Sequence, residues 1–211
     1  SLKSALAAPE ILLGVFAPHC AAAALRLLKS YDLPIGAAVC DALLDDSSGK
    51  GSPFQALLLH GSKECEALVD ELMAREPKLK AALNDSALIA ALTPKTQEAA
   101  LRLIEERGVE ITDAVPEYLT KGTSSSVKDA GTKDKTWTPV VPLTALVLDE
   151  SCASLVDVLC AKDASIKAAV KAPATIAAVA TPAKAGIALK LIETYNIEIG
   201  DELAGLLMAK D

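Results

Sequence analysis

A 13-residue pattern recurs five times along the chain and constrains the fold more than any other feature. Each copy is an apolar-rich stretch with helical spacing, followed by a polar turn and a closing Leu or Ile. The copies span residues 23–35, 67–79, 99–111, 154–166 and 187–199. A repeat of this kind predicts stacked units, each burying its apolar stripe against its neighbours.

The spacing of the copies supports a regular step. The second and third copies start 32 residues apart, and the fourth and fifth start 33 apart. The other two gaps are longer, 44 and 55 residues, and each contains a polar, loop-like insertion, at residues 45–52 and 121–140. The pattern therefore indicates a step near 33 residues with insertions at two junctions.

A second, shorter apolar helix is predicted before each copy, over residues 10–16, 54–60, 87–92, 143–148 and 175–179. Two of the connecting turns are Thr93-Pro94 and Thr181-Pro182, which predicts each Thr as an N-cap with Pro at the first helical position. An extra short helix is predicted after the odd copies, over residues 36–44, 112–120 and 200–208. After the even copies the chain is expected to run directly into the next helix pair.

We therefore predict an all-α chain of about five tandem helix-turn-helix repeats, stacked as a short solenoid in a single repeat array, residues 1–211. Its predicted parts are repeat 1 with an extra helix (8–44), a loop (45–52), repeat 2 (53–84), repeat 3 with an extra helix (85–120), a polar insertion (121–140), repeat 4 (141–171) and repeat 5 with an extra helix (172–211). Residues 121–136 are expected to be mobile or extended, because they contain little apolar surface to bury. Leu103, Leu159 and Leu191 are expected to be buried at repeat contacts.

The helix pairs and their step resemble ankyrin repeats over nearly the whole chain. Residues 154–166 and the stretch 106–111 are similar to the second ankyrin helix and the turn after it. Ser52-Pro53-Phe54 and Val141-Pro142-Leu143 resemble the Thr-Pro-Leu that opens an ankyrin repeat, and His60-Gly61 falls at the usual inter-helix turn. No copy has the full Thr-Pro-Leu-His, and the extra helices stand where ankyrin proteins have a β-hairpin finger. A different α-solenoid of similar period is the structural alternative.

Charge and cysteine content exclude several classes of protein. The formal net charge is −7 and no Lys/Arg-rich run occurs, so a nucleic-acid partner is not expected. The apolar stretch 5–25 is interrupted by Pro9 and Pro18 and matches charged internal segments, so we interpret it as a repeat and expect no membrane span. The five cysteines form no CxxC pair, which indicates buried free thiols in a reducing, intracellular compartment.

The sequence contains no pattern typical of catalysis, and we predict no catalytic residue, no cofactor, no metal and no enzymatic activity. His19 and Cys20 are adjacent and point in different directions on a helix, which makes them a poor base and nucleophile pair. The acidic pairs Asp45-Asp46, Glu105-Glu106 and Asp149-Glu150 are interpreted as solvated charge. Phosphate-loop, dinucleotide and zinc-protease motifs are absent from the sequence.

The predicted function is that of a protein-protein interaction module or scaffold, because a solenoid offers a preformed face. A permanent structural subunit of a larger assembly is the alternative, and an enzyme with no recognisable motif is a remote one. The candidate partner contacts are Trp137, Lys135, Asp45, Asp46 and His60. Trp137 either packs against repeat 4 or is an exposed anchor for a partner.

The first predicted helix is apolar where a terminal repeat normally carries a polar cap. It contains Leu12, Leu13, Val15 and Phe16. We therefore expect this N-terminal face to be covered by further repeats, by a second copy of the chain or by a partner.

Overall fold

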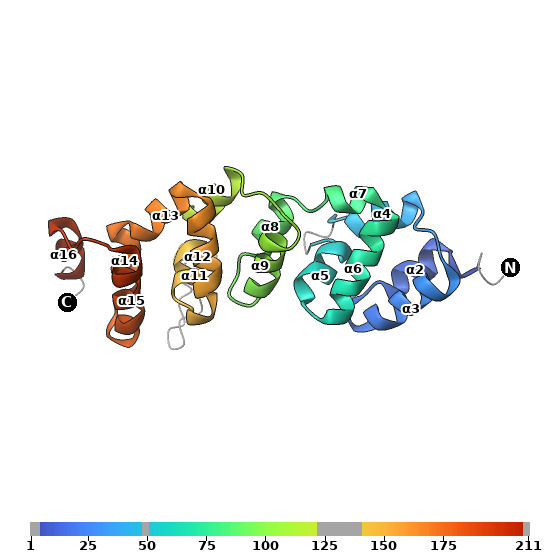
Figure 1. The fold of residues 1–211 in the computed structure, drawn as a ribbon, viewed down its shortest axis with the longest axis horizontal. Coiled ribbons are helices and arrows are strands. Elements are labelled where there is room, and N and C mark those ends of the chain that lie inside the picture. The colour runs from blue at the N-terminus through green and yellow to red at the C-terminus, as the bar shows by residue number, and fades with distance from the viewer. Residues whose placement is uncertain (1–4, 48–50, 122–140, 209–211) are drawn as a thin grey trace, which may run out of the picture. The chain divides into compact units, whose positions relative to one another are not determined.

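The computed structural model describes residues 5–47, 51–121 and 141–208. Within these ranges it contains fifteen α-helices, three short 3-10 helices and no strand. The prediction of an all-α chain is confirmed (Figure 1).

The helices follow one recurring order: a short helix, a longer one and another short one. Their bounds are α2 (Pro9–Val15), α3 (Ala21–Tyr31), α4 (Ala37–Leu44), α5 (Pro53–His60), α6 (Lys63–Arg75), α7 (Pro77–Ala81), α8 (Asp85–Ala91), α9 (Gln97–Glu105), α10 (Ala114–Thr120), α11 (Pro142–Val147), α12 (Ala153–Lys162), α13 (Ala164–Lys171), α14 (Pro173–Val179), α15 (Ala185–Tyr195) and α16 (Asp201–Met208). The 3-10 helices η1 (Pro18–Cys20), η2 (Glu150–Cys152) and η3 (Pro182–Lys184) each lead directly into a longer helix. The predicted short helices and the three extra helices are found close to their expected bounds.

The expectation that the even copies lack an extra helix is wrong. Each is followed by a short helix, α7 and α13, whose start lies inside the 13-residue pattern. The side chain of Glu76 accepts a hydrogen bond from the Lys78 amide, and that of Asp163 accepts from the Ser165 and Ile166 amides. These acidic N-caps turn a stretch that resembles a connecting loop into a helix.

The predicted N-cap at Thr93 is wrong, whereas Thr181 does stand at an N-cap position with Pro182 directly after it, at the start of a 3-10 helix. Thr181 precedes the 3-10 helix η3, and its side chain makes no capping bond. The Thr93 hydroxyl bonds the Thr96 hydroxyl at 2.6 Å, and α9 begins only at Gln97. In both places the proline starts a tight turn ahead of the α-helix.

The chain divides into two compact units, each described here by itself. Unit 1 comprises residues 1–91 and 98–110; in it α3 packs along α6, and α4 packs on α2, α5 and α7. Unit 2 comprises residues 92–97 and 111–211; in it α10 packs on α11 and α13, α12 on α13, and α16 on α14. The single-array organisation stays a prediction.

Aliphatic side chains form the core of both units. Leu159 is fully buried, and Leu103 and Leu191 are 2% and 9% exposed, so the predicted burial of these three is confirmed. Cys65 and Cys152 are fully buried as small apolar residues, and all five cysteines are free thiols. Burial raises the pKa of the Cys40, Cys152 and Cys160 thiols, which favours their neutral form.

The first helix packs by one side into unit 1. Leu12 and Phe16 are buried, Leu13 and Val15 are half-buried, and Ile11 is exposed. What covers the outer side of this helix stays a prediction. Across the three described ranges no single helix is long and apolar enough to span a membrane; α2 and the stretch Pro18–Tyr31 meet that test only as a pair bent by 92°.

We predict that Leu159→Ala lowers the free energy of unfolding by about 2–5 kcal/mol, since it removes a fully buried side chain and leaves a cavity. Urea denaturation followed by circular dichroism measures the change. Lys162→Ala, an exposed position on the same helix, is the control and is expected to stay within about 0.5 kcal/mol. A similarly small effect for Leu159→Ala would place that side chain outside the core.

Gly61→Ala is expected to destabilise the protein. Gly61 ends α5 in the left-handed region at φ 73°, and a Cβ there would lie 2.9 Å from Nη2 of Arg102. Gly205→Ala, in the middle of α16 with open space around it, is expected to stabilise by about 0.5–1 kcal/mol. Thermal denaturation compares the two variants, and a higher melting temperature for Gly61→Ala would contradict the clash.

Candidate functional site

Of the five predicted partner contacts, the structure describes three, Asp45, Asp46 and His60. Trp137 and Lys135 lie outside the described residues, as does most of the insertion predicted to be mobile. Asp45 and Asp46 are exposed directly after α4, in the stretch that leads to α5, and His60 is exposed at the end of α5. The eight residues of α5, about 12 Å of helix, lie between that stretch and His60. Their part in partner binding stays a prediction.

Asp45 and Asp46 have a local structural use. The carboxylate of Asp45 accepts hydrogen bonds from the amide and the hydroxyl of Ser47. Asp46 accepts one from the Gly51 amide at 2.7 Å. Both side chains therefore shape the loop that leads into α5.

Sequence reasoning missed a contact between His60 and Cys65. The Cys65 sulfur lies 3.5 Å from Nδ1 of His60 and 3.6 Å from the carbonyl oxygen of Pro18. Cys65 is fully buried, so a substrate cannot reach its sulfur directly. The pair packs the turn between α5 and α6. The sequence feature that could have predicted this contact is the separation of the two residues by five positions across that turn.

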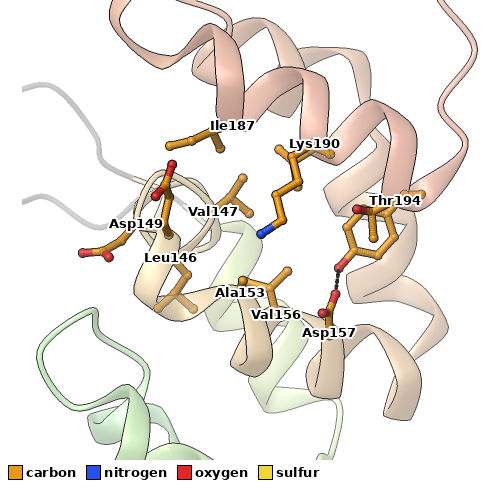
Figure 2. A pocket seen from close by; sticks show the side chains of 12 residues that line it. Leu146, Val147, Asp149, Ala153, Val156, Asp157, Ile187, Lys190 and Thr194 are labelled. Carbon is orange, nitrogen blue, oxygen red and sulfur yellow. Dashed lines mark hydrogen bonds between the residues drawn. The ribbon is translucent and has the colours of Figure 1, made fainter.

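In unit 2 a groove lies between α12 and α15, with an empty volume of about 470 Å³ (Figure 2). We call it the α12–α15 groove. Its apolar floor is formed by Leu146, Val147, Ala153, Val156, Ile187 and Leu191. On α12 and α15 the lining residues recur at three- and four-residue spacing, which places them on one face of each helix.

Charged and polar side chains surround this floor. Asp149 follows α11, and Asp157 lies on α12 (Figure 2). Glu150 is the first residue of η2, and Tyr195 on α15 bonds Asp157. Lys190 extends from α15 across the groove (Figure 2). Lys190 and Glu150 are exposed, and neither forms an ion pair with a described residue.

A matching junction in unit 1 lies between α6 and α9. Its hollow is smaller, about 240 Å³, and its lining can be aligned with that of the groove, by the 13-residue pattern on the longer helices and by Pro53 and Pro142 on the shorter ones. Val69 corresponds to Val156, Leu103 to Leu191, and Leu57 and Leu58 to Leu146 and Val147. The two hollows therefore have corresponding apolar linings.

Two substitutions distinguish the open groove from its counterpart. In unit 1, Nε of Arg102 pairs with Glu66 at 2.9 Å, and both side chains occupy the hollow. At the corresponding positions of unit 2 stand Lys190 and Ala153. The small Ala153 leaves space and no carboxylate, so Lys190 has no such partner and the floor stays open.

The far end of each junction carries a bond between equivalent residues. Arg107 bonds Asp70 at 2.7 Å in unit 1, and the Tyr195 hydroxyl donates to Asp157 at 2.7 Å in unit 2. Asp70 and Asp157 occupy the fourth position of their copies, and Arg107 and Tyr195 the ninth. Partial burial, followed by the bond to Asp157, raises the pKa of Tyr195.

Tyr195 is therefore expected to make stability fall in alkaline solution. In the unfolded chain a tyrosine loses its proton near pH 10, whereas folded Tyr195 retains it, so unfolding releases a proton. The contribution is full below that pH and is lost as the pH rises above it. Urea unfolding between about pH 8 and pH 11 should show a steeper loss for the native chain than for Tyr195→Phe. Parallel curves would show that Tyr195 titrates alike in both states.

No group of three or more potential metal-ligating side chains gathers within the described part of the chain. The α12–α15 groove combines an apolar floor with an acidic rim, an arrangement suited to holding an amphipathic segment. Comparisons with protein-family models, with curated proteins and with solved structures give no match.

Proposed function

We propose that the chain is a helical-repeat protein that binds a segment of another protein in the α12–α15 groove. The observation that carries the proposal is the comparison of the two junctions. At α6–α9 the chain fills the hollow with its own Arg102 and Glu66, and at α12–α15 an equivalent apolar floor is left open. An open apolar floor with a polar rim is typical of recognition sites.

The proposal includes ankyrin-like repeats stacked as a short solenoid. The recurring order of short, longer and short helices supports it. So does the bond between the fourth and ninth positions, which occurs in both units with different side chains. In such an array the helices are held by their neighbours, so a groove between two of them exists before the partner arrives and costs little to order.

A permanent structural subunit is the second candidate. Six large apolar side chains are exposed in the described residues: Ile11, Tyr31, Leu189, Ile199, Leu206 and Met208. All six fall within the first and last predicted repeats, and Met208 is 78% exposed. A permanent subunit would bury these side chains of both repeats against its neighbours, whereas recognition in the α12–α15 groove would use one site.

We expect peptides that bind the α12–α15 groove to lose affinity when a larger side chain fills the groove. Ala153→Gln places a side chain with the shape of Glu66 over the floor, and its amide oxygen can accept a bond from Lys190. Peptides selected from a random phage-displayed library on the native chain should bind this variant at least about tenfold more weakly, as measured by fluorescence anisotropy.

Ser154→Gln is the matched control, because it adds the same side chain one residue further along, at an exposed position outside the groove. Its affinity for the selected peptides should equal that of the native chain. If no selected peptide loses affinity for Ala153→Gln, groove recognition is wrong.

A further inference from the structure

We infer that the α12–α15 groove takes a partner segment with basic side chains on either side of an apolar one. This inference rests on the proposed function and adds the chemistry of the partner. It comes from the charges around the two equivalent junctions, which differ although the apolar floors correspond.

The α6–α9 junction is electrically balanced. Glu66 pairs with Arg102 and Asp70 pairs with Arg107, so two carboxylates face two guanidinium groups. The α12–α15 groove is not balanced: Asp149, Glu150 and Asp157 face Lys190 alone. Lys184 lines an adjoining hollow together with Asp149 and Glu150; its amine bonds the Leu148 carbonyl oxygen at 3.3 Å, and, after the hydrogen bonds from Ser151, its charge also lowers the pKa of Asp149. Even with Lys184 included, carboxylates outnumber amines.

The imbalance has a specific source at one end of the groove. The fourth-position carboxylate meets a guanidinium in unit 1, Arg107, and a neutral phenol in unit 2, Tyr195. Asp157 therefore keeps an uncompensated charge. Its Oδ1 accepts from Tyr195, and its Oδ2 has no hydrogen-bond partner among the described residues.

At the other end of the α12–α15 groove, carboxylate oxygens are also free to accept hydrogen bonds from a partner. Oδ1 of Asp149 accepts from both the amide and the hydroxyl of Ser151, which lowers the pKa of Asp149 and keeps it ionised. Its Oδ2 and the carboxylate of Glu150 accept no hydrogen bond within the described ranges. A guanidinium bonds two such oxygens at once, which makes arginine the fitting side chain.

The distance between the two acidic ends sets the spacing of the partner's basic residues. Residue 150 opens η2 and residue 157 lies on α12, so three 3-10 steps and four α-helical steps separate them by at most about 12 Å. An extended peptide covers that length in about three residues. Apolar side chains between two arginines would then lie over Val156 and Leu191, both buried floor residues.

An acidic segment is the opposing possibility, since its carboxylate could take the place of Glu66 beside Lys190. Three surrounding carboxylates would repel it, whereas a basic segment is attracted by them and meets only two amines, those of Lys190 and Lys184. The charge balance therefore favours the basic segment.

Three fluorescein-labelled octapeptides test the inference with the full chain. All share a central Leu-Leu, flanked on both sides by Arg in the first, by Ser in the second and by Glu in the third. In anisotropy titrations the Arg peptide should bind at least about tenfold more tightly than the Ser peptide, and the Glu peptide most weakly. Raising the salt concentration should weaken the Arg peptide alone.

Carboxylate variants locate the effect. Glu150→Gln and Asp157→Asn should each weaken the Arg peptide about threefold to tenfold and leave the Ser peptide unchanged. Asn at position 157 still accepts from Tyr195, and circular dichroism checks the fold. Glu193→Gln, an exposed carboxylate on α15 outside the groove, is the control and should have no effect.

The outcomes separate this inference from the proposed function. Tighter binding of the Ser or Glu peptide, lost in Ala153→Gln, would leave groove recognition standing and overturn the basic partner. No measurable binding of the Arg peptide would also overturn it. If the Arg peptide binds Ala153→Gln and both carboxylate variants as it binds the native chain, its site lies elsewhere and the inference is wrong, while library-selected peptides decide groove recognition separately.

Discussion

Burial of aliphatic side chains between neighbouring short helices is the interaction on which the rest of this structure depends. The longest described helix, α6, has 13 residues, and isolated helices shorter than about 12–15 residues are marginal in water. Leucines such as Leu68, Leu103 and Leu159 are almost completely buried, so each helix is held by the ones beside it. With only 3% aromatic residues, these contacts are made by small and branched side chains, which lets the helices pack closely.

Within each unit, polar bonds between the longer helices, or the turns that follow them, fix how these helices are aligned with one another. In unit 1, Arg75 on α6 bonds Glu71 on its own helix, and Asp32 and the Leu33 carbonyl oxygen at the end of α3. Arg107 bonds Asp70 on α6, and Tyr195 bonds Asp157 on α12; both aspartates occupy the fourth position of their 13-residue copies. Such partly exposed bonds add modest stability each, but a helix shifted by one residue would lose them. Recurrence with different donors indicates that the position matters more than the side chain.

The difference between a filled junction and an open groove comes from very few residues. Ala153 in place of Glu66 removes a side chain from the floor, and Tyr195 in place of Arg107 removes a positive charge from the rim. The backbone frame need not change for either effect. In our proposal, a repeated scaffold thus acquires a recognition site by local departure from its own pattern, where an apolar floor and an acidic rim coincide.

The helical class, the positions of most helices and the buried leucines followed from the sequence alone, because a 3.6-residue apolar period repeated five times has few other solutions. The sequence did not predict helices α7 and α13, because their N-caps, Glu76 and Asp163, stand in stretches that also resemble polar turns. The sequence pointed to the acidic pair Asp149-Glu150 only as solvated charge. That these two residues share a groove with Asp157 and Lys190 was decided by the packing of α12 against α15, since a cavity depends on which side chains meet across helices and how much space they leave. Only the tertiary structure revealed that Ala153 leaves open what Glu66 and Arg102 fill.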